Sequence, residues 1–240
     1  MIESPNIQPV APPRKHLLRS LIKWACICIL AMWSLAALTL VAARWIDPPT
    51  SALHIERRLQ AFIHGKPYQD HYKFVPLIQI SPNLQHAVIA AEDARFYQHH
   101  GFDWQAMEIA AEDDLDGGRR IRGGSTLTQQ LVKNLFFGTS QSILLKGLRK
   151  GAEFTLVPVA ELVLGKQRIL ELYLNVVEWG PGIYGAESAC RAWDKTAARS
   201  VTREESAQLA AVLPAPLKRK PERMSRYTAI ILERMRQMNW

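Results

Sequence analysis

The chain has 240 residues and a formal net charge of +8, from 30 Lys and Arg against 22 Asp and Glu. This length suits one globular domain with some additional segments and excludes a large multi-domain assembly. With 48% hydrophobic and 22% charged residues the chain can bury a core, which excludes a disordered tail or a fibrous repeat. The positive charge favours anionic partners: nucleic acid, anionic lipid headgroups or a phosphorylated substrate.

An uncharged apolar run of 20 residues covers positions 24–43. At 1.5 Å per residue, a helix of this length crosses the hydrocarbon core of a bilayer, which is about 30 Å thick. Four basic residues precede the run: Arg14, Lys15, Arg19 and Lys23. The positive-inside rule therefore predicts a cytoplasmic tail at 1–23, a transmembrane helix at 24–43 and an exported remainder. A cleavable signal peptide is the alternative, and the length of the run favours an uncleaved anchor.

Residues 44–75 are expected to form a stalk or linker, because a Pro48-Pro49 breaker precedes a polar stretch. Over residues 76–240, apolar positions recur with helical spacing and without sustained alternation, which predicts a mainly α domain. Ser81 before Pro82 marks one helix start, and Ser125 or Thr126 is expected to cap another. The other expected elements are helices near 103–112, from Leu148 with a kink at Pro158, and over 166–177, 202–213 and 222–238, with a glycine-rich loop at 180–185.

The first cluster with chemical potential is Glu92-Asp93, followed by Phe96 and His99. Paired carboxylates at a helix end, beside an aromatic ring and a histidine, can hold one acid with a shifted pKa. Taken alone, such a pair also fits a solvated helix end. The histidines at 99 and 100 lack the spacing of a metal motif, so no dedicated metal site is predicted.

Two further clusters carry cations. In Arg149-Lys150-x-x-Glu153, the spacing of four places Arg149 and Glu153 on one helical face and supplies donors for a phosphate. In the turn at 123–126, backbone N–H groups together with Lys133 suit an anion. An ordinary helical salt bridge and a simple helix cap remain the alternatives for these two clusters.

Together these segments resemble the glycosyltransferase family that polymerises peptidoglycan, shared by class A penicillin-binding proteins and the monofunctional biosynthetic peptidoglycan transglycosylases. The resemblance covers about residues 76–220 and follows the family's motif order. It rests on EDxxFxxHxG at 92–101, GGSTxTQQxxKN at 123–134, RKxxE at 149–153, ILELYLN at 169–175 with the glycines at 180–185, and the segment from Glu205 to Pro214. Because no transpeptidase-sized region follows Trp240, we expect the monofunctional type.

The resemblance implies a lysozyme-like helical domain with a small membrane-leaning part around 134–148. It implies action on lipid II and the nascent glycan strand, at the periplasmic face of the inner (plasma) membrane. Glu92 is expected to be the general base in an inverting attack of the GlcNAc 4-hydroxyl on MurNAc C1. Glu153 is expected either to orient the cations or to hold a metal ion, with Mg²⁺ the expected cofactor. The expected substrate-binding residues are Asp93, Phe96, His99, Ser125, Thr126, Gln129, Gln130, Lys133, Asn134, Arg149 and Lys150.

Other functions stay open at this point. A lytic muramidase of similar fold needs one acid but no pyrophosphate site, so Lys133 and Arg149 argue against it. A non-catalytic scaffold for cell-division or elongation proteins would need neither glutamate. The basic runs at 119–122 and 218–220 accompany no nucleic-acid motif, so we expect them to face lipid headgroups or solvent and expect no nucleic-acid partner. Gln141-Ser142 stands where the family usually has an Arg-Ser pair, which removes one expected phosphate contact to the donor. Residues 192–195 replace the family's usual Tyr-Phe-Gly-Lys, which affects the expected local shape.

Overall fold

The computed structural model describes residues 14–115, 124–139 and 143–240, so Gln141-Ser142 and the basic run at 119–122 lie outside the described residues. The described chain is mainly helical, which confirms the expected fold class. Its elements in order are α1 (Arg14–Ala42), α2 (Ala52–Ile63), β1 (His71–Tyr72), η1 (Leu77–Gln79), α3 (Pro82–Glu92), α4 (Trp104–Leu115), α5 (Leu127–Phe136), α6 (Ile143–Val176), β2 (Glu178–Gly180), β3 (Ile183–Tyr184), α7 (Ala186–Trp193), η2 (Ala198–Ser200), α8 (Arg203–Ala210), η3 (Pro221–Arg223) and α9 (Ser225–Gln237).

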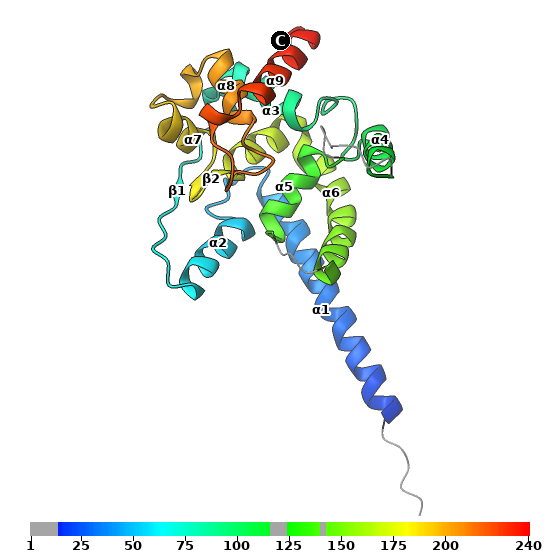
Figure 1. The fold of residues 1–240 in the computed structure, drawn as a ribbon. Coiled ribbons are helices and arrows are strands. Elements are labelled where there is room, and N and C mark those ends of the chain that lie inside the picture. Colours follow the sequence, from blue (N-terminus) through cyan, green and yellow to red (C-terminus); the bar gives the residue numbers. More distant parts are fainter. Residues whose placement is uncertain (1–13, 116–123, 140–142) are drawn as a thin grey trace, which may run out of the picture.

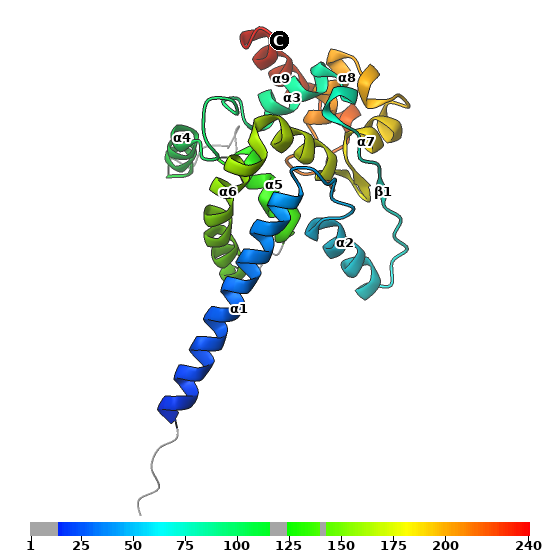
Figure 2. The same ribbon diagram turned by 180° about the vertical axis from the view of Figure 1, so that it is seen from behind.

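Helix α1 extends well beyond the rest of the molecule (Figures 1 and 2). Its segment Leu18–Ala42 is long and apolar enough to cross a membrane, close to the predicted run at 24–43. The upper part of α1 is fixed to α6, because Trp33 Nε1 donates to Thr155 Oγ1 at 2.9 Å. Arg168, in the second half of α6, donates to the carbonyl of Ala43 at 2.8 Å and to Asp47 Oδ1 at 2.8 Å.

Residues 44–75 differ from the predicted stalk, since they form α2 and β1. Helix α2 begins after Ser51, whose hydroxyl accepts the backbone N–H of His54 at 3.3 Å. At the end of the segment, the Asn175 side chain makes two hydrogen bonds to the backbone of Val75. Its amide accepts from the Val75 N–H and donates to the Val75 carbonyl, both at 2.9 Å. These contacts join positions 100 residues apart, so local patterning could not show them.

The expected helix starts are confirmed. Ser81 caps α3, and Thr126 caps α5 in a reciprocal capping box with Gln129. In α6 the predicted kink at Pro158 is wrong, whereas the non-helical angles at Gly165, with φ +71°, fall directly before the expected helix over 166–177. Glycine takes this left-handed conformation without a Cβ clash, whereas Pro158 keeps a φ compatible with a helix.

The glycine-rich segment at 180–185 forms a small sheet rather than a loop. Strand β3 pairs antiparallel with β2 and parallel with β1, giving the order β1-β3-β2. Gly182 has φ +72°, and a Cβ there would lie 2.5 Å from the Gln69 carbonyl oxygen, so glycine is required at this turn.

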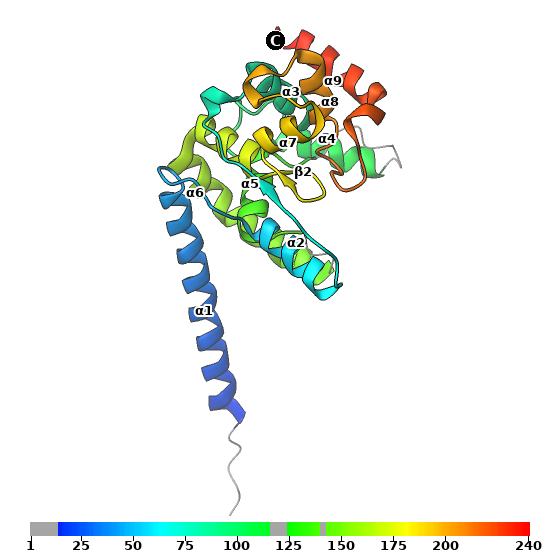
Figure 3. The same cartoon turned by 90° about the vertical axis from the view of Figure 1, so that its left-hand side faces the viewer.

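The core lies where α3, α5, the second half of α6 and α8 meet, and includes the fully buried Leu84, Leu131, Tyr173 and Trp179. Helix α3 packs on α8 and α9, and α5 packs along α6. Figure 3 shows α3, α8 and α9 together on one side, with α2 and the lower parts of α5 and α6 on the side from which α1 extends. The residues with expected chemistry lie at the junction of α3, α5 and α6.

Candidate active site

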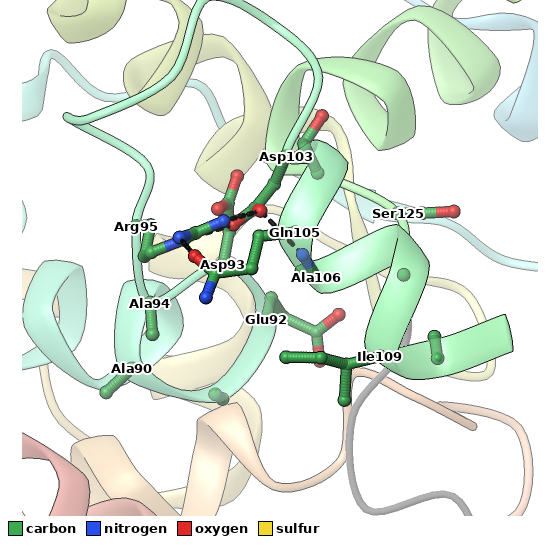
Figure 4. A pocket seen from close by; sticks show the side chains of 14 residues that line it. Ala90, Glu92, Asp93, Ala94, Arg95, Asp103, Gln105, Ala106, Ile109 and Ser125 are labelled. Carbon is green, nitrogen blue, oxygen red and sulfur yellow. Dashed lines mark hydrogen bonds and ion pairs between the residues drawn. The ribbon is translucent and has the colours of Figure 1, made fainter. Parts of the chain in front are cut away.

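Glu92 is the last residue of α3, and the chain leaves the helix at Asp93 with φ −156° and ψ 72°. Its side chain points between the end of α3 and helix α4 (Figure 4). The cavity there has a volume of about 230 Å³ and is also lined by Ile109 and the exposed Ser125. A carboxylate is therefore presented to an open cavity from a fixed helix end.

A hydrogen-bonded chain holds the Glu92 carboxylate. Gln130 Nε2 donates to Glu92 Oε2 at 2.9 Å, and Tyr173 Oη donates to Gln130 Oε1 at 3.0 Å. Burial raises the pKa of Glu92, while the Gln130 hydrogen bond and the charges of Lys133 and Arg219 oppose that rise. A carboxylate with a raised pKa takes up a proton more readily, which is the property a general base needs near neutral pH.

Three cations surround the second glutamate. Glu153 is buried, with Arg149 Nε 3.2 Å from its Oε1 and Lys150 Nζ 3.2 Å from its Oε2. Burial lowers the pKa of Lys133, with the nearby Glu153 opposing that change and Arg149 adding to it. Lys133 is also close enough to Glu92 for the two charges to interact, so its ammonium group is near both glutamates. The structure thus brings together the acid and the cations that the motifs predicted.

Asp93, the residue after Glu92, makes hydrogen bonds that connect two parts of the fold. His99 Nε2 donates to Asp93 Oδ1 at 2.9 Å, and the Leu127 N–H donates to Asp93 Oδ2 at 2.9 Å. The Gly101 N–H donates to His99 Nδ1 at 3.1 Å, which places the imidazole proton on Nε2. Asp93 therefore ties the end of α3 to the first turn of α5, and both carboxylate oxygens are occupied.

Several expected substrate-binding residues lie inside the protein. Phe96 is fully buried, with Lys166 Nζ 4.6 Å from its ring centroid. Thr126 donates to the Gly101 carbonyl at 2.6 Å and is bound to Gln129 by the capping box, and Gln129 and Asn134 are both buried. Phe96 and Gln129 therefore support the site from inside the protein and do not line the cavity.

Two residues near Glu92, Tyr173 and Arg219, were not predicted from the sequence to belong to this site. Tyr173 lies in the ILELYLN segment, but nothing in its apolar setting marked its hydroxyl as the end of the Glu92 chain. Arg219 was expected to face lipid or solvent. It instead lies close enough to lower the pKa of Glu92, donates to the Ala211 carbonyl at 2.9 Å and stacks over Tyr227.

The described residues do not fit a resident divalent cation. Mg²⁺ prefers several oxygen ligands in octahedral geometry, whereas Glu153 supplies one carboxylate already paired with two cations. Asp93, His99 and Asp103 come close enough to bind a metal. In that group, however, Asp93 accepts from His99 and Leu127, and Asp103 is paired with Arg95. The positive charge that the described residues bring to this site comes from Lys133, Arg149 and Lys150.

Comparison with known sequences decides the family. The profile described as Transglycosylase matches residues 57–236, three quarters of the chain. The chain belongs to the transglycosylase family. This transglycosylase is a glycosyltransferase with a lysozyme-like helical domain, and the matched range includes most of α2.

Two relatives support the assignment over most of the chain. A protein named biosynthetic peptidoglycan transglycosylase from Xanthomonas campestris pv. campestris is 42% identical over 233 residues, which cover 95% of this chain and 92% of the relative. A protein of the same name from Pseudomonas putida is 44% identical over 186 residues, covering 78% of this chain and 77% of the relative.

Proposed function

We propose that this transglycosylase polymerises peptidoglycan from lipid II. The acceptor GlcNAc 4-hydroxyl would lose its proton to Glu92 while its oxygen attacks C1 of the donor MurNAc. The bond from C1 to the pyrophosphate oxygen breaks as the new glycosidic bond forms, with inversion at C1 and undecaprenyl pyrophosphate as the leaving group. The observation that carries the proposal is the Glu92 carboxylate, which lines the cavity and accepts from Gln130 Nε2 at 2.9 Å, together with the cations that Glu153 pairs.

Each group has a place in this step. The raised pKa of Glu92 suits proton uptake, and Gln130 holds the carboxylate in one orientation. Lys133 and Arg149 would face the charge that develops on the pyrophosphate, the main electrostatic demand of the reaction. Glu153 orients Arg149 and Lys150 by its two ion pairs and so acts as a positioning residue.

The same arrangement disfavours a hydrolytic muramidase. Glycan cleavage needs an acid and a water but no anion site, so a half-buried lysine near two further cations would be without use. A muramidase would shorten preformed strands, whereas the proposed enzyme lengthens them. Incubating both lipid II and purified glycan strands with the protein separates these functions.

We further propose that α1 anchors the protein in the inner membrane with residues 1–23 cytoplasmic and the catalytic domain periplasmic. The support is the basic cluster before the apolar segment of α1. A reporter fused after Trp240 tests the orientation, and a cytoplasmic signal would contradict it. Division or elongation proteins are the expected recruiting partners, to be sought by crosslinking in cells.

The decisive experiment compares the wild type with Glu92→Gln in detergent, using labelled lipid II and gel separation of glycan strands. The amide keeps the shape of the side chain and removes the base. Glu233→Gln, the same change at an exposed residue of α9, is the matched control. We expect strands from the wild type and the control only, and equal polymer from Glu92→Gln would refute the assignment of the base.

A further inference from the structure

Helix α2 carries its apolar residues on its outward face. Ile55, Leu59, Phe62 and Ile63 are 54%, 55%, 83% and 68% exposed. Their spacing of four, seven and eight places them on one side of the helix, and we call this set the α2 stripe. A surface helix ordinarily turns such a stripe towards the core, so the exposure of four large side chains together is unusual.

The remainder of α2 is bound to the protein: Leu53 and His54 are buried, and polar side chains beside them make specific contacts. Glu56 accepts from the Thr139 hydroxyl at 2.9 Å, and Arg57 pairs with the buried Glu178 at 3.0 Å. Arg57, Gln60 and Glu178 also line a hollow of about 490 Å³. Rotating α2 to bury the stripe would leave Glu178 unpaired inside the protein, so these contacts hold the apolar face outward.

The position of the stripe indicates what covers it. The C-terminal end of α2 extends to the same side of the domain as α1, a relation visible in both Figure 1 and Figure 3. Phe62 and Ile63, the most exposed members, lie at that end. Lys66 follows directly and is exposed. Apolar side chains next to a basic residue, beside a helix that could cross a bilayer, are typical of a segment lying in the membrane interface.

We propose that the α2 stripe inserts into the boundary between headgroups and acyl chains of the bilayer that α1 crosses. The inference rests on α1 spanning that membrane and not on glycosyl transfer. Helix α2 then has lipid against the stripe and the hollow lined by Arg57 and Glu178 on its other side. The domain would be supported on the bilayer at a second place besides its anchor.

The test places an environment-sensitive fluorophore on the stripe of the full chain. Cys26, Cys28 and Cys190 are first replaced by alanine, and Phe62→Cys is labelled with a nitrobenzoxadiazole probe. Ala229→Cys, on an exposed site of α9 far from α1, is the matched control. Both are reconstituted in nanodiscs of phosphatidylethanolamine and phosphatidylglycerol without lipid II, with or without lipids carrying a nitroxide on the acyl chain.

At position 62 we expect emission at shorter wavelength and loss of intensity with nitroxide lipid, and at position 229 neither effect. Equal quenching of both probes by aqueous iodide would overturn the proposal. Shielding of position 62 from iodide without quenching by nitroxide lipid would also overturn it, because a second copy or another protein would then cover the stripe. Leu59→Cys replaces Phe62→Cys if the latter lowers the unfolding temperature. No substrate enters the measurement, so its result is independent of the polymerase assay.

Discussion

Gln130 donates its amide N–H to the Glu92 carboxylate at 2.9 Å, and so favours the charged form of the acid that burial disfavours. Helix α5 thereby sets the proton affinity of a residue at the end of α3. Because the two helices are joined a second time through Asp93 and Leu127, the distance between Gln130 and Glu92 is tightly controlled. Four predictions follow from this geometry and from the charges around it.

Gln130→Met removes the donor while keeping the length of the side chain. The pKa of Glu92 should rise further, so the base stays protonated to higher pH and the acid limb of the kcat/KM profile moves upward. A hydrogen bond to a charged group contributes about 1.5–3 kcal/mol, which corresponds to roughly one to two pH units. Gln237→Met, at an exposed site, should leave the profile unchanged, and an unmoved limb in Gln130→Met would contradict the role given to this amide.

Lys133→Met should lower kcat by about 10²–10³-fold, the loss found when one preorganised donor to a developing anion is removed. Burial lowers the pKa of Lys133, so its charge is lost as pH rises through a value below that of an ordinary lysine. Lys133→Arg retains the charge at high pH and should move the basic limb of the profile upward. An exposed lysine, Lys218, provides the control for both substitutions, and full activity in Lys133→Met would exclude its contact with the leaving group.

Arg219→Gln should shift the acid limb in the same direction as Gln130→Met, but by less. Its positive charge helps to lower the pKa of Glu92 without a direct hydrogen bond, so its loss lets that pKa rise. Arg223→Gln removes a charge from an exposed site of the nearby 3₁₀ turn and serves as the control. Added salt should leave the difference largely intact if Arg219 acts within the partly buried site.

Asp93→Asn should destabilise the fold by about 1–3 kcal/mol, since an amide cannot accept from both His99 and the Leu127 N–H. The measurement is thermal unfolding of the detergent-solubilised chain. Asp47→Asn changes an aspartate whose side chain is 53% exposed and should have little effect. Equal stability losses in the two variants would mean that the Asp93 contacts do not hold α3 to α5.

Features set by neighbouring residues could be predicted from the sequence, whereas features set by residues far apart in the chain could not. Ser81 and Thr126 marked their helices because a cap is a local device. The motifs also singled out Glu92, Lys133 and Glu153, whose roles in the site stay predictions. Tyr173 and Arg219 approach Glu92 from remote segments, so no spacing rule linked them to it. Helix α2 was missed because the segment after Pro48-Pro49 was interpreted as a linker, and β1 and β3 are too short to show alternation.

The hydrogen bonds from Trp33 and Arg168 join the anchor directly to α6, the helix that carries Arg149 and Glu153. A domain on a flexible tether could turn to follow its product, whereas a domain fixed in this way would keep one height and tilt relative to the membrane that α1 is proposed to cross. Under the proposed activity, the growing glycan strand would move while the enzyme stays fixed. Replacing α1 by another apolar helix without Trp33 would keep the membrane attachment but remove the contact that fixes the domain's orientation. We expect this change to alter the length of the glycan strands.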